Sequence, residues 1–131
     1  MEKSFELKKS PGCQARPMQS SACISTTETC STVCVLDIRR GSPTCDKHVA
    51  RVISAANQFL VPIGFAHGIC TVEPNTEVIY KVTNCYSPEH DRGVLWNDPD
   101  LGIAWPVAEA QAILSDKDRK QPRFRELQAY F

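Results

Sequence analysis

Several features are missing from this chain of 131 residues. It carries no formal net charge, because 15 Lys and Arg residues balance 15 Asp and Glu residues, so it has no general attraction to nucleic acid. No apolar run approaches the roughly 20 residues that span a bilayer. The opening residues Met1–Lys9 contain no apolar secretion segment. We therefore expect a cytoplasmic protein with no membrane or nucleic-acid partner.

Closely spaced cysteine pairs are also missing, although seven cysteines is a high count. An odd number cannot all pair within one chain, and disulfides are rare outside oxidising compartments. Structural zinc sites usually combine close pairs to complete a tetrahedron, and here only Cys30 and Cys34 lie within four positions of each other. We expect unpaired thiols and no metal or other cofactor. A thiol-based redox or metal-binding module would rest on the cysteine count alone, and we rank it last.

Residues 10–34 are rich in Ser, Thr, Cys, Gln and Pro, and they sustain neither a helical nor a strand period. One interpretation is a disordered or loosely attached segment. A second is a shifted reading frame, because the codons of Thr27–Val33 can be chosen so that another frame encodes Gly-Asp-Val-Phe-Asp-Gly. The gene sequence would refute the second interpretation if its shifted translation gave no such strand. We leave residues 1–34 unassigned and take residues 35–131 as one unit.

Beyond residue 35 the pattern is that of an all-β protein. Four segments have the apolar, β-branched or aromatic runs of short strands: Val49–Ser54, Phe59–Pro62, Ile69–Val72 and Glu77–Thr83. Short strands at regular spacing favour a sandwich or barrel over alternating strands and helices. Only the C-terminal part has helical character, and we expect short helices within Val107–Leu114 and Arg123–Ala129.

The segment Pro62–Gly68 contains the first candidate site residue. Gly64 permits a tight turn and Gly68 lets backbone pass close to His67, which predicts a histidine at the inner mouth of a barrel. Tyr80 follows thirteen residues later, a separation that suits pairing in a β-hairpin. Its phenol could donate a proton, and nearby cations could lower its pKa. Taken alone, each residue is more often a structural histidine or a core aromatic.

A second candidate is the charged cluster of Lys117 and Asp118, which follows apolar Ile113 and Leu114. An isolated cluster of this kind is usually a solvated turn. Its functional interpretation has Lys117 holding a phosphate and Asp118 orienting a histidine. Several other polar or aromatic residues favour structural roles: Arg39 and Arg40 before a turn, Glu89–Asp91 in a polar loop, and Trp96 and Trp105 as core or sheet cover.

Five motifs occur in one order along the second part of the chain: Asp37-Ile-Arg-Arg-Gly-Ser-Pro-Thr44, Pro62-Ile-Gly-Phe-Ala-His-Gly68, Tyr86-Ser-Pro-Glu-His-Asp91, Trp96-Asn-Asp-Pro-Asp100 and Leu114-Ser-Asp-Lys-Asp118. In this order and near this spacing, from Val35 to about Glu126, they resemble the dTDP-4-dehydrorhamnose 3,5-epimerase family. The resemblance implies a partial cupin-like jelly-roll β-barrel with short C-terminal helices. It also implies a homodimer, no metal or other cofactor, and a dTDP-4-dehydro-6-deoxyhexose as substrate.

The resemblance assigns a role to individual residues. In the family a histidine, held by an aspartate, removes the C3 and C5 protons of the 4-keto sugar, and a tyrosine returns protons to the opposite face. Tyr80 matches this proton donor and Asp118 the aspartate. Substrate-binding positions are matched by four further residues: His67, Tyr86, Asp91 and Lys117.

One family segment has no counterpart. The Arg-Gly-Leu-His-Tyr stretch, which holds a phosphate-binding arginine and the base histidine, does not occur in this sequence. General-base contributions amount to about 10²–10⁴-fold, so we expect an impaired epimerase of dTDP-rhamnose or another deoxysugar pathway. The alternative is a non-catalytic remnant that binds a nucleotide sugar weakly or pairs with an intact homologue.

Overall fold

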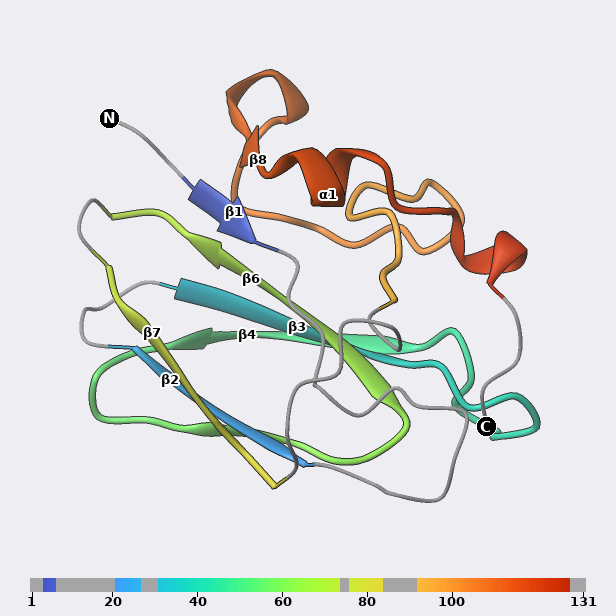
Figure 1. Cartoon of the computed structure of the whole chain (residues 1–131), viewed down its shortest axis with the longest axis horizontal. Coiled ribbons are helices and arrows are strands. Elements are labelled where there is room, and N and C mark those ends of the chain that lie inside the picture. The colour runs from blue at the N-terminus through green and yellow to red at the C-terminus, as the bar shows by residue number, and fades with distance from the viewer. Residues whose placement is uncertain (1–3, 7–20, 27–30, 74–75, 84–91, 128–131) are drawn as a thin grey trace.

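The chain folds into two facing β-sheets, shown in a computed structural model that describes residues 4–6, 21–26, 31–73, 76–83 and 92–127 (Figure 1). The strands in these ranges are β1 (Ser4–Glu6), β2 (Ala22–Thr26), β3 (Ser31–Asp37), β4 (His48–Ile53), β5 (Phe59–Val61), β6 (Phe65–Thr71), β7 (Val78–Val82) and β8 (Ile113–Leu114). The first sheet has the order β4-β3-β6-β1-β8 and the second the order β5-β2-β7. The β1–β8 pair is parallel, and the other pairs described are antiparallel.

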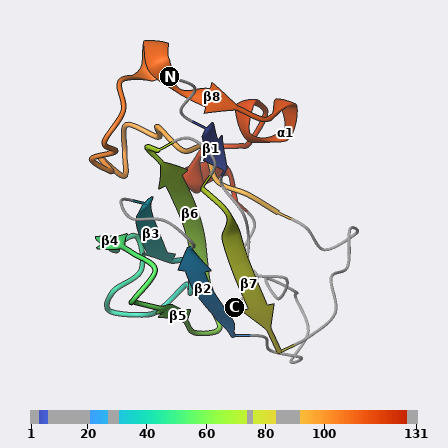
Figure 2. The ribbon, with the colours of Figure 1, turned by 90° about the vertical axis from the view of Figure 1, so that its left-hand side faces the viewer.

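The main core lies between the two sheets, which Figure 2 shows as separate layers. In β2 every second residue is buried, so Ala22, Ile24 and Thr26 point inward. They meet inward-facing residues of the larger sheet, and the buried core cluster comprises Ala22, Ile24, Val33, Val35, Ile53, Val61 and Ile69. Each fully buried aliphatic side chain of this kind contributes about 1.5–3 kcal/mol.

The outer face of the five-stranded sheet is covered by the C-terminal part of the chain. Strands β3 and β6 are therefore buried on both faces. Trp96 is buried against Cys70 and Val107, and Trp105 packs on the same cluster. The indole Nε1 of Trp105 donates a hydrogen bond to the carbonyl of Trp96 at 2.8 Å. Both tryptophans thus have the sheet-covering role that the sequence favoured.

The turn between β3 and β4 is organised by one buried carboxylate. Asp37 is 1% exposed, and its two oxygens accept hydrogen bonds from the backbone N, Nε and Nη2 of Arg39 and from the hydroxyls of Ser42 and Thr44, at 2.6–3.0 Å. The Arg39 guanidinium also lies over the ring of Phe65, 4.6 Å from its centroid. The Asp37–Thr44 motif therefore has a structural role.

The C-terminal helices are shorter than the sequence predicted. They are the 3₁₀ helices η2 (Glu109–Gln111) and η3 (Phe124–Glu126) and the one-turn α1 (Asp116–Arg119). Within Val107–Leu114 only Glu109–Gln111 is helical, because Ile113 and Leu114 pair with β1 as strand β8. The all-β fold class with short C-terminal helices is confirmed.

The segment before residue 35 contributes to both sheets. Strand β2 and most of β3 lie within residues 1–34, where no strand period is sustained in the sequence. The domain boundary at residue 35 and the shifted reading frame remain predictions.

Candidate active site

His67 enters the interior from the middle of β6. Side chains alternate along a strand, so Phe65, His67 and Ile69 share the face that meets the three-stranded sheet. The strand is preceded by Gly64, whose φ of +81° favours glycine. His67 is 2% exposed, which places it deeper than the barrel mouth that the sequence predicted.

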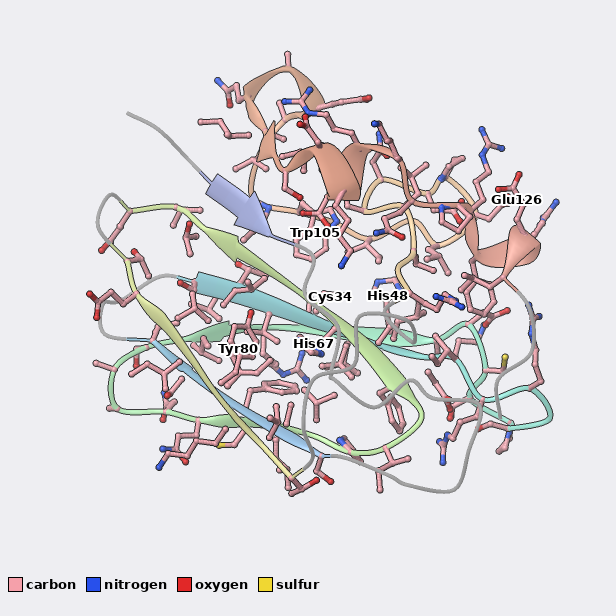
Figure 3. All side chains as sticks on the ribbon, viewed as in Figure 1. Cys34, His48, His67, Tyr80, Trp105 and Glu126 are labelled. Atoms are coloured by element: carbon pink, nitrogen blue, oxygen red, sulfur yellow. The ribbon has the colours of Figure 1, made fainter. Side chains whose placement is uncertain are left out.

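Tyr80 approaches the same point from β7 in the other sheet. It packs against the core cluster between the sheets, and its ring centroid lies 5.7 Å from that of His67 with the planes tilted by 41°. Figure 3 shows the two side chains directed toward one another between the layers. The predicted hairpin pairing of their strands was wrong: β6 pairs with β3 and β1, and β7 pairs with β2. The two residues meet across the sandwich instead.

Burial keeps both of these groups neutral near pH 7. Removal from water lowers the pKa of His67 to about 4, because the charged imidazolium is poorly solvated there. The same desolvation raises the pKa of Tyr80 above its ordinary value, rather than lowering it as nearby cations would. The pair can therefore offer a phenol O–H donor and a neutral imidazole, which carries one donor and one acceptor nitrogen.

The imidazole of His67 has unused hydrogen-bonding capacity. Neither Nδ1 nor Nε2 has a hydrogen-bond partner in the described part of the chain. Buried polar groups are nearly always paired with protein, water or a ligand. An unpaired buried imidazole beside a tyrosine is therefore a position where a polar ligand can bind.

Asp118 and Lys117 lie apart from this pair. Both belong to α1, beside β8 and β1 at the edge of the larger sheet opposite β4 (Figures 1 and 2). Asp118 is 2% exposed, so the solvated-turn interpretation is wrong for this residue, whereas Lys117 is exposed. Within the described ranges, no hydrogen bond links Asp118 to His67 or Tyr80.

Two predicted site residues, Tyr86 and Asp91, fall outside the described residues. Arg39 and Arg40, for which the sequence favoured structural roles, both contact other residues of the fold. Arg39 is bound to Asp37. Arg40 donates to the carbonyls of Phe124 and Leu127 and lies over the Phe124 ring, 5.0 Å from its centroid.

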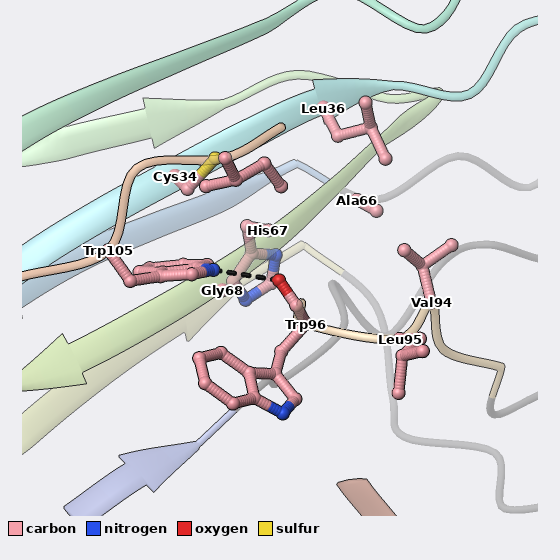
Figure 4. A pocket seen from close by; sticks show the side chains of 10 residues that line it. Cys34, Leu36, Ala66, His67, Gly68, Val94, Leu95, Trp96 and Trp105 are labelled. Carbon is pink, nitrogen blue, oxygen red and sulfur yellow. Dashed lines mark hydrogen bonds between the residues drawn. The ribbon is translucent and has the colours of Figure 1, made fainter. Parts of the chain in front are cut away.

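A small cavity lies on the other face of β6, under the C-terminal layer (Figure 4). Its volume is about 20 Å³, and it is lined by Cys34, Leu36, Ala66, His67, Gly68, Val94, Leu95, Trp96, Ile103 and Trp105. Burial raises the pKa of the Cys34 thiol to about 12, so this cysteine is an inert thiol. Ligand sites typically need roughly 300–1,000 Å³, so this cavity is too small for a sugar nucleotide.

A larger hollow of about 350 Å³ lies on the C-terminal layer between Trp96 and Glu109, and it contains none of the predicted site residues. Among the described residues there is no group of three His, Cys, Asp or Glu that could hold a metal ion. No helix in the described ranges is long and apolar enough to cross a membrane.

Two relevant residues escaped the sequence analysis. Ser115 contacts Asp118 directly, and its spacing of Ser-x-x-Asp before a helix is a capping signature that could have indicated this contact. Asp98 is 1% exposed and accepts a hydrogen bond from the backbone N of Phe124 at 2.7 Å. No sequence spacing signals that second contact, because 26 residues separate the partners.

Comparison with known proteins identifies a family match along most of the chain. The model of the family described as dTDP-4-dehydrorhamnose 3,5-epimerase matches residues 13–126. A dTDP-4-dehydrorhamnose 3,5-epimerase from Sinorhizobium fredii is 48% identical over 98 residues, which cover 73% of this chain and 50% of that relative. The corresponding protein from Pseudomonas aeruginosa is 42% identical over 97 residues, covering 72% and 53%. The chain spans about half the length of the curated relatives it matches.

Solved structures give the same match in three dimensions. A dTDP-4-dehydrorhamnose 3,5-epimerase from Bacillus anthracis, with TDP and PPi bound, superposes with a TM-score of 0.77 at 41% identity, covering 93% of this chain and 72% of the other. A dTDP-6-deoxy-D-glucose-3,5-epimerase from Legionella pneumophila, in complex with dTDP-4-keto-L-rhamnose, gives a TM-score of 0.78 at 31% identity, covering 98% and 71%.

Proposed function

Because the chain belongs to the dTDP-4-dehydrorhamnose 3,5-epimerase family, we propose that it is an epimerase-like protein acting on a dTDP-4-dehydro-6-deoxyhexose. The observation that carries this proposal is the buried pair of His67 and Tyr80, whose ring centroids are 5.7 Å apart between the sheets. The Legionella protein was solved with dTDP-4-keto-L-rhamnose, which supports a substrate of this class.

In this proposal Tyr80 delivers a proton to the sugar. Its phenol is protonated at neutral pH because burial raises its pKa. The 4-keto group acidifies the neighbouring C–H bonds. Because the family's base histidine does not occur in the sequence, solvent water accepts the proton, and the resulting enolate is reprotonated with inversion by a tyrosine on the opposite face. His67 binds the neutral sugar through its ring nitrogens, which have no partner among the described residues.

The C-terminal residues have supporting roles in this proposal. Asp118 supplies the carboxylate that orients the base histidine in other family members, and exposed Lys117 holds the diphosphate. Tyr86 and Asp91 contact the substrate, as their positions in the family motif suggest. A base histidine in the family's Arg-Gly-Leu-His-Tyr setting does not occur in the sequence, so we propose that turnover is slow.

We also propose a cytoplasmic homodimer. The cysteines in the described ranges (Cys23, Cys34, Cys45 and Cys70) are all free thiols, as in a reducing compartment. β4 lies at the edge of the larger sheet with Val49 and Val52 47% and 66% exposed. An exposed apolar edge of this kind is a surface that another chain can cover. Size-exclusion chromatography with light scattering would measure the oligomeric state.

The activity is tested by incubating the purified protein with dTDP-4-dehydro-6-deoxyglucose in D₂O and measuring deuterium at C3 and C5 by mass spectrometry. We expect incorporation above the protein-free control, at a rate about 10²–10⁴-fold below that of a full-length family member. Binding of the nucleotide sugar without any incorporation would instead support the non-catalytic remnant.

A further inference from the structure

Asp118 is held by a neighbour on its own helix. The Ser115 hydroxyl donates a hydrogen bond to Oδ2 of Asp118 at 2.7 Å, and the same hydroxyl oxygen accepts one from the backbone N of Asp118 at 3.2 Å. The single hydroxyl thus binds both the main chain and the side chain of Asp118. Two such bonds fix the carboxylate relative to the helix, whereas a cap alone would fix only the backbone.

Burial makes the bond to the carboxylate significant. Asp118 is 2% exposed, and among the described residues Ser115 supplies the only hydrogen bond to its carboxylate oxygens. A buried carboxylate needs such donors, because it has lost most of its contact with water. Oδ1 accepts no hydrogen bond in the described part of the chain, so this oxygen can accept one from another group.

The position of Ser115 is itself well determined. Leu114, the last residue of β8, pairs with Phe5 of β1 and packs against the cluster that contains Trp96. Ser115 follows with extended backbone (φ −66°, ψ 155°) as the N-cap of α1, and its carbonyl accepts a hydrogen bond from the N of Arg119 at 3.2 Å. The pairing of β8 with β1 therefore fixes the position of the Ser115 hydroxyl, and this hydroxyl in turn orients the Asp118 carboxylate.

We propose that Ser115 is a positioning residue for Asp118. Its hydroxyl holds the carboxylate in one rotamer, so that Oδ1 stays available to the group that accepts the proton of the sugar. The inference rests on the proposed function for the role of Asp118, but the positioning itself can be measured without catalysis. Ser115 is exposed, so variants at this position can be made without disturbing the core.

Three variants separate the cap from the positioning bond. Ser115→Thr keeps both hydrogen bonds. Ser115→Gly removes the hydroxyl but remains an acceptable N-cap, whereas Ser115→Ala loses both functions. The side-chain χ1 angle of Asp118 is measured in each protein from three-bond NMR couplings of its Hβ protons. The melting temperature and the deuterium incorporation at C3 and C5 are measured on the same samples.

We expect a single Asp118 rotamer in the wild type and in Ser115→Thr, and rotamer averaging in both Ser115→Gly and Ser115→Ala. The melting temperature should fall by a few degrees in Ser115→Ala and by less in Ser115→Gly. Deuterium incorporation should fall about tenfold in both variants that lack the hydroxyl.

An Asp118 side chain that stays in one rotamer in the folded Gly and Ala variants would overturn the inference. Rotamer averaging as predicted, with no incorporation by the wild type, would refute the proposed function and leave the positioning role standing.

Discussion

His67 of β6 and Tyr80 of β7 lie on opposite sheets, and their ring centroids are 5.7 Å apart. Their strands share no backbone hydrogen bonds, because β6 pairs with β3 and β1 while β7 pairs with β2. The contact therefore depends on the packing of one sheet on the other. Ile24 and Val35, both part of the core cluster, connect the same two layers. Changes that separate the sheets should disturb the pair even when each strand remains intact.

The stability of the protein should decrease as the pH falls from about 6.5 to about 4. His67 has a folded-state pKa of about 4, below the ordinary value of about 6.5, so the unfolded chain binds a proton in this range before the folded chain does. The stabilisation from neutral His67 is complete above its unfolded-state pKa, and it is lost as the pH falls toward its folded-state pKa. At pH 4.5 we expect this residue to lower the free energy of unfolding by about 2–3 kcal/mol.

Urea unfolding of the wild type and His67→Gln at pH 7 and pH 4.5 measures this effect. The carboxylates titrate in both proteins, so the difference between the two isolates His67. The variant should lose less stability than the wild type between the two pH values. Equal losses would show that His67 is not buried as described.

Removal of the Asp37 carboxylate should destabilise the fold. Asp37→Ala breaks the bonds to Arg39, Ser42 and Thr44, and we expect a loss of roughly 2–3 kcal/mol. This is less than the 3–5 kcal/mol of a fully buried pair, because the Arg39 side chain is 42% exposed. These bonds also hold the pKa of Asp37 well below its ordinary value. Its contribution should therefore be present above about pH 3.8 and be lost as the pH falls through the lower folded-state value.

Lys47→Ala is the matched control for that measurement. Lys47 forms an ion pair with Asp46 at 3.1 Å, with the two side chains 75% and 55% exposed. Exposed pairs contribute about 0–1 kcal/mol. Chemical denaturation should show a larger loss of unfolding free energy for Asp37→Ala than for Lys47→Ala. An Asp37→Ala protein as stable as Lys47→Ala would contradict the structural role of the carboxylate.

Alanine should be less tolerated at Gly64 than at Gly41. Both glycines have a positive φ, +81° and +88°, so each substitution incurs a backbone strain of about 1 kcal/mol. At Gly64 an added Cβ would also lie 2.5 Å from Cγ and Cδ of Arg39, whereas at Gly41 it would meet nothing within 4 Å. We expect Gly64→Ala to cost about 1–2 kcal/mol more than Gly41→Ala, as measured by thermal unfolding. Equal costs would mean that Arg39 can move away freely.

The sequence predicted the strand-forming segments better than their partners. Val49–Ser54 and Glu77–Thr83 have clear β composition. The first covers all of β4 except His48 and the second contains β7, but composition carries no information on which strand lies beside which. The hairpin prediction for His67 and Tyr80 failed for this reason. Val107–Leu114 has good helix formers, and there the pairing of β8 with β1 overrode local propensity.

Among the site residues, the burial of Asp118 was the hardest property to predict from the sequence. Three charged residues in succession, Asp116 to Asp118, suggest a solvated segment, yet the one-turn helix buries the third of them. Burial of a single carboxylate depends on the elements packed around it, which the local sequence does not specify. The contact of His67 with Tyr80 likewise depends on sheet packing, so only the family motif indicated that both belong to one site.

The most direct test of the proposed chemistry compares the wild type with Tyr80→Phe. Phenylalanine keeps the ring that packs between the sheets and removes only the hydroxyl. With protein in excess over dTDP-4-dehydro-6-deoxyglucose in D₂O, deuterium at C3 and C5 is followed by mass spectrometry, and circular dichroism checks the fold. We predict measurable incorporation by the wild type and a decrease of about 10²–10⁴-fold in the variant. Equal incorporation by the two folded proteins would contradict the role of Tyr80 as proton donor.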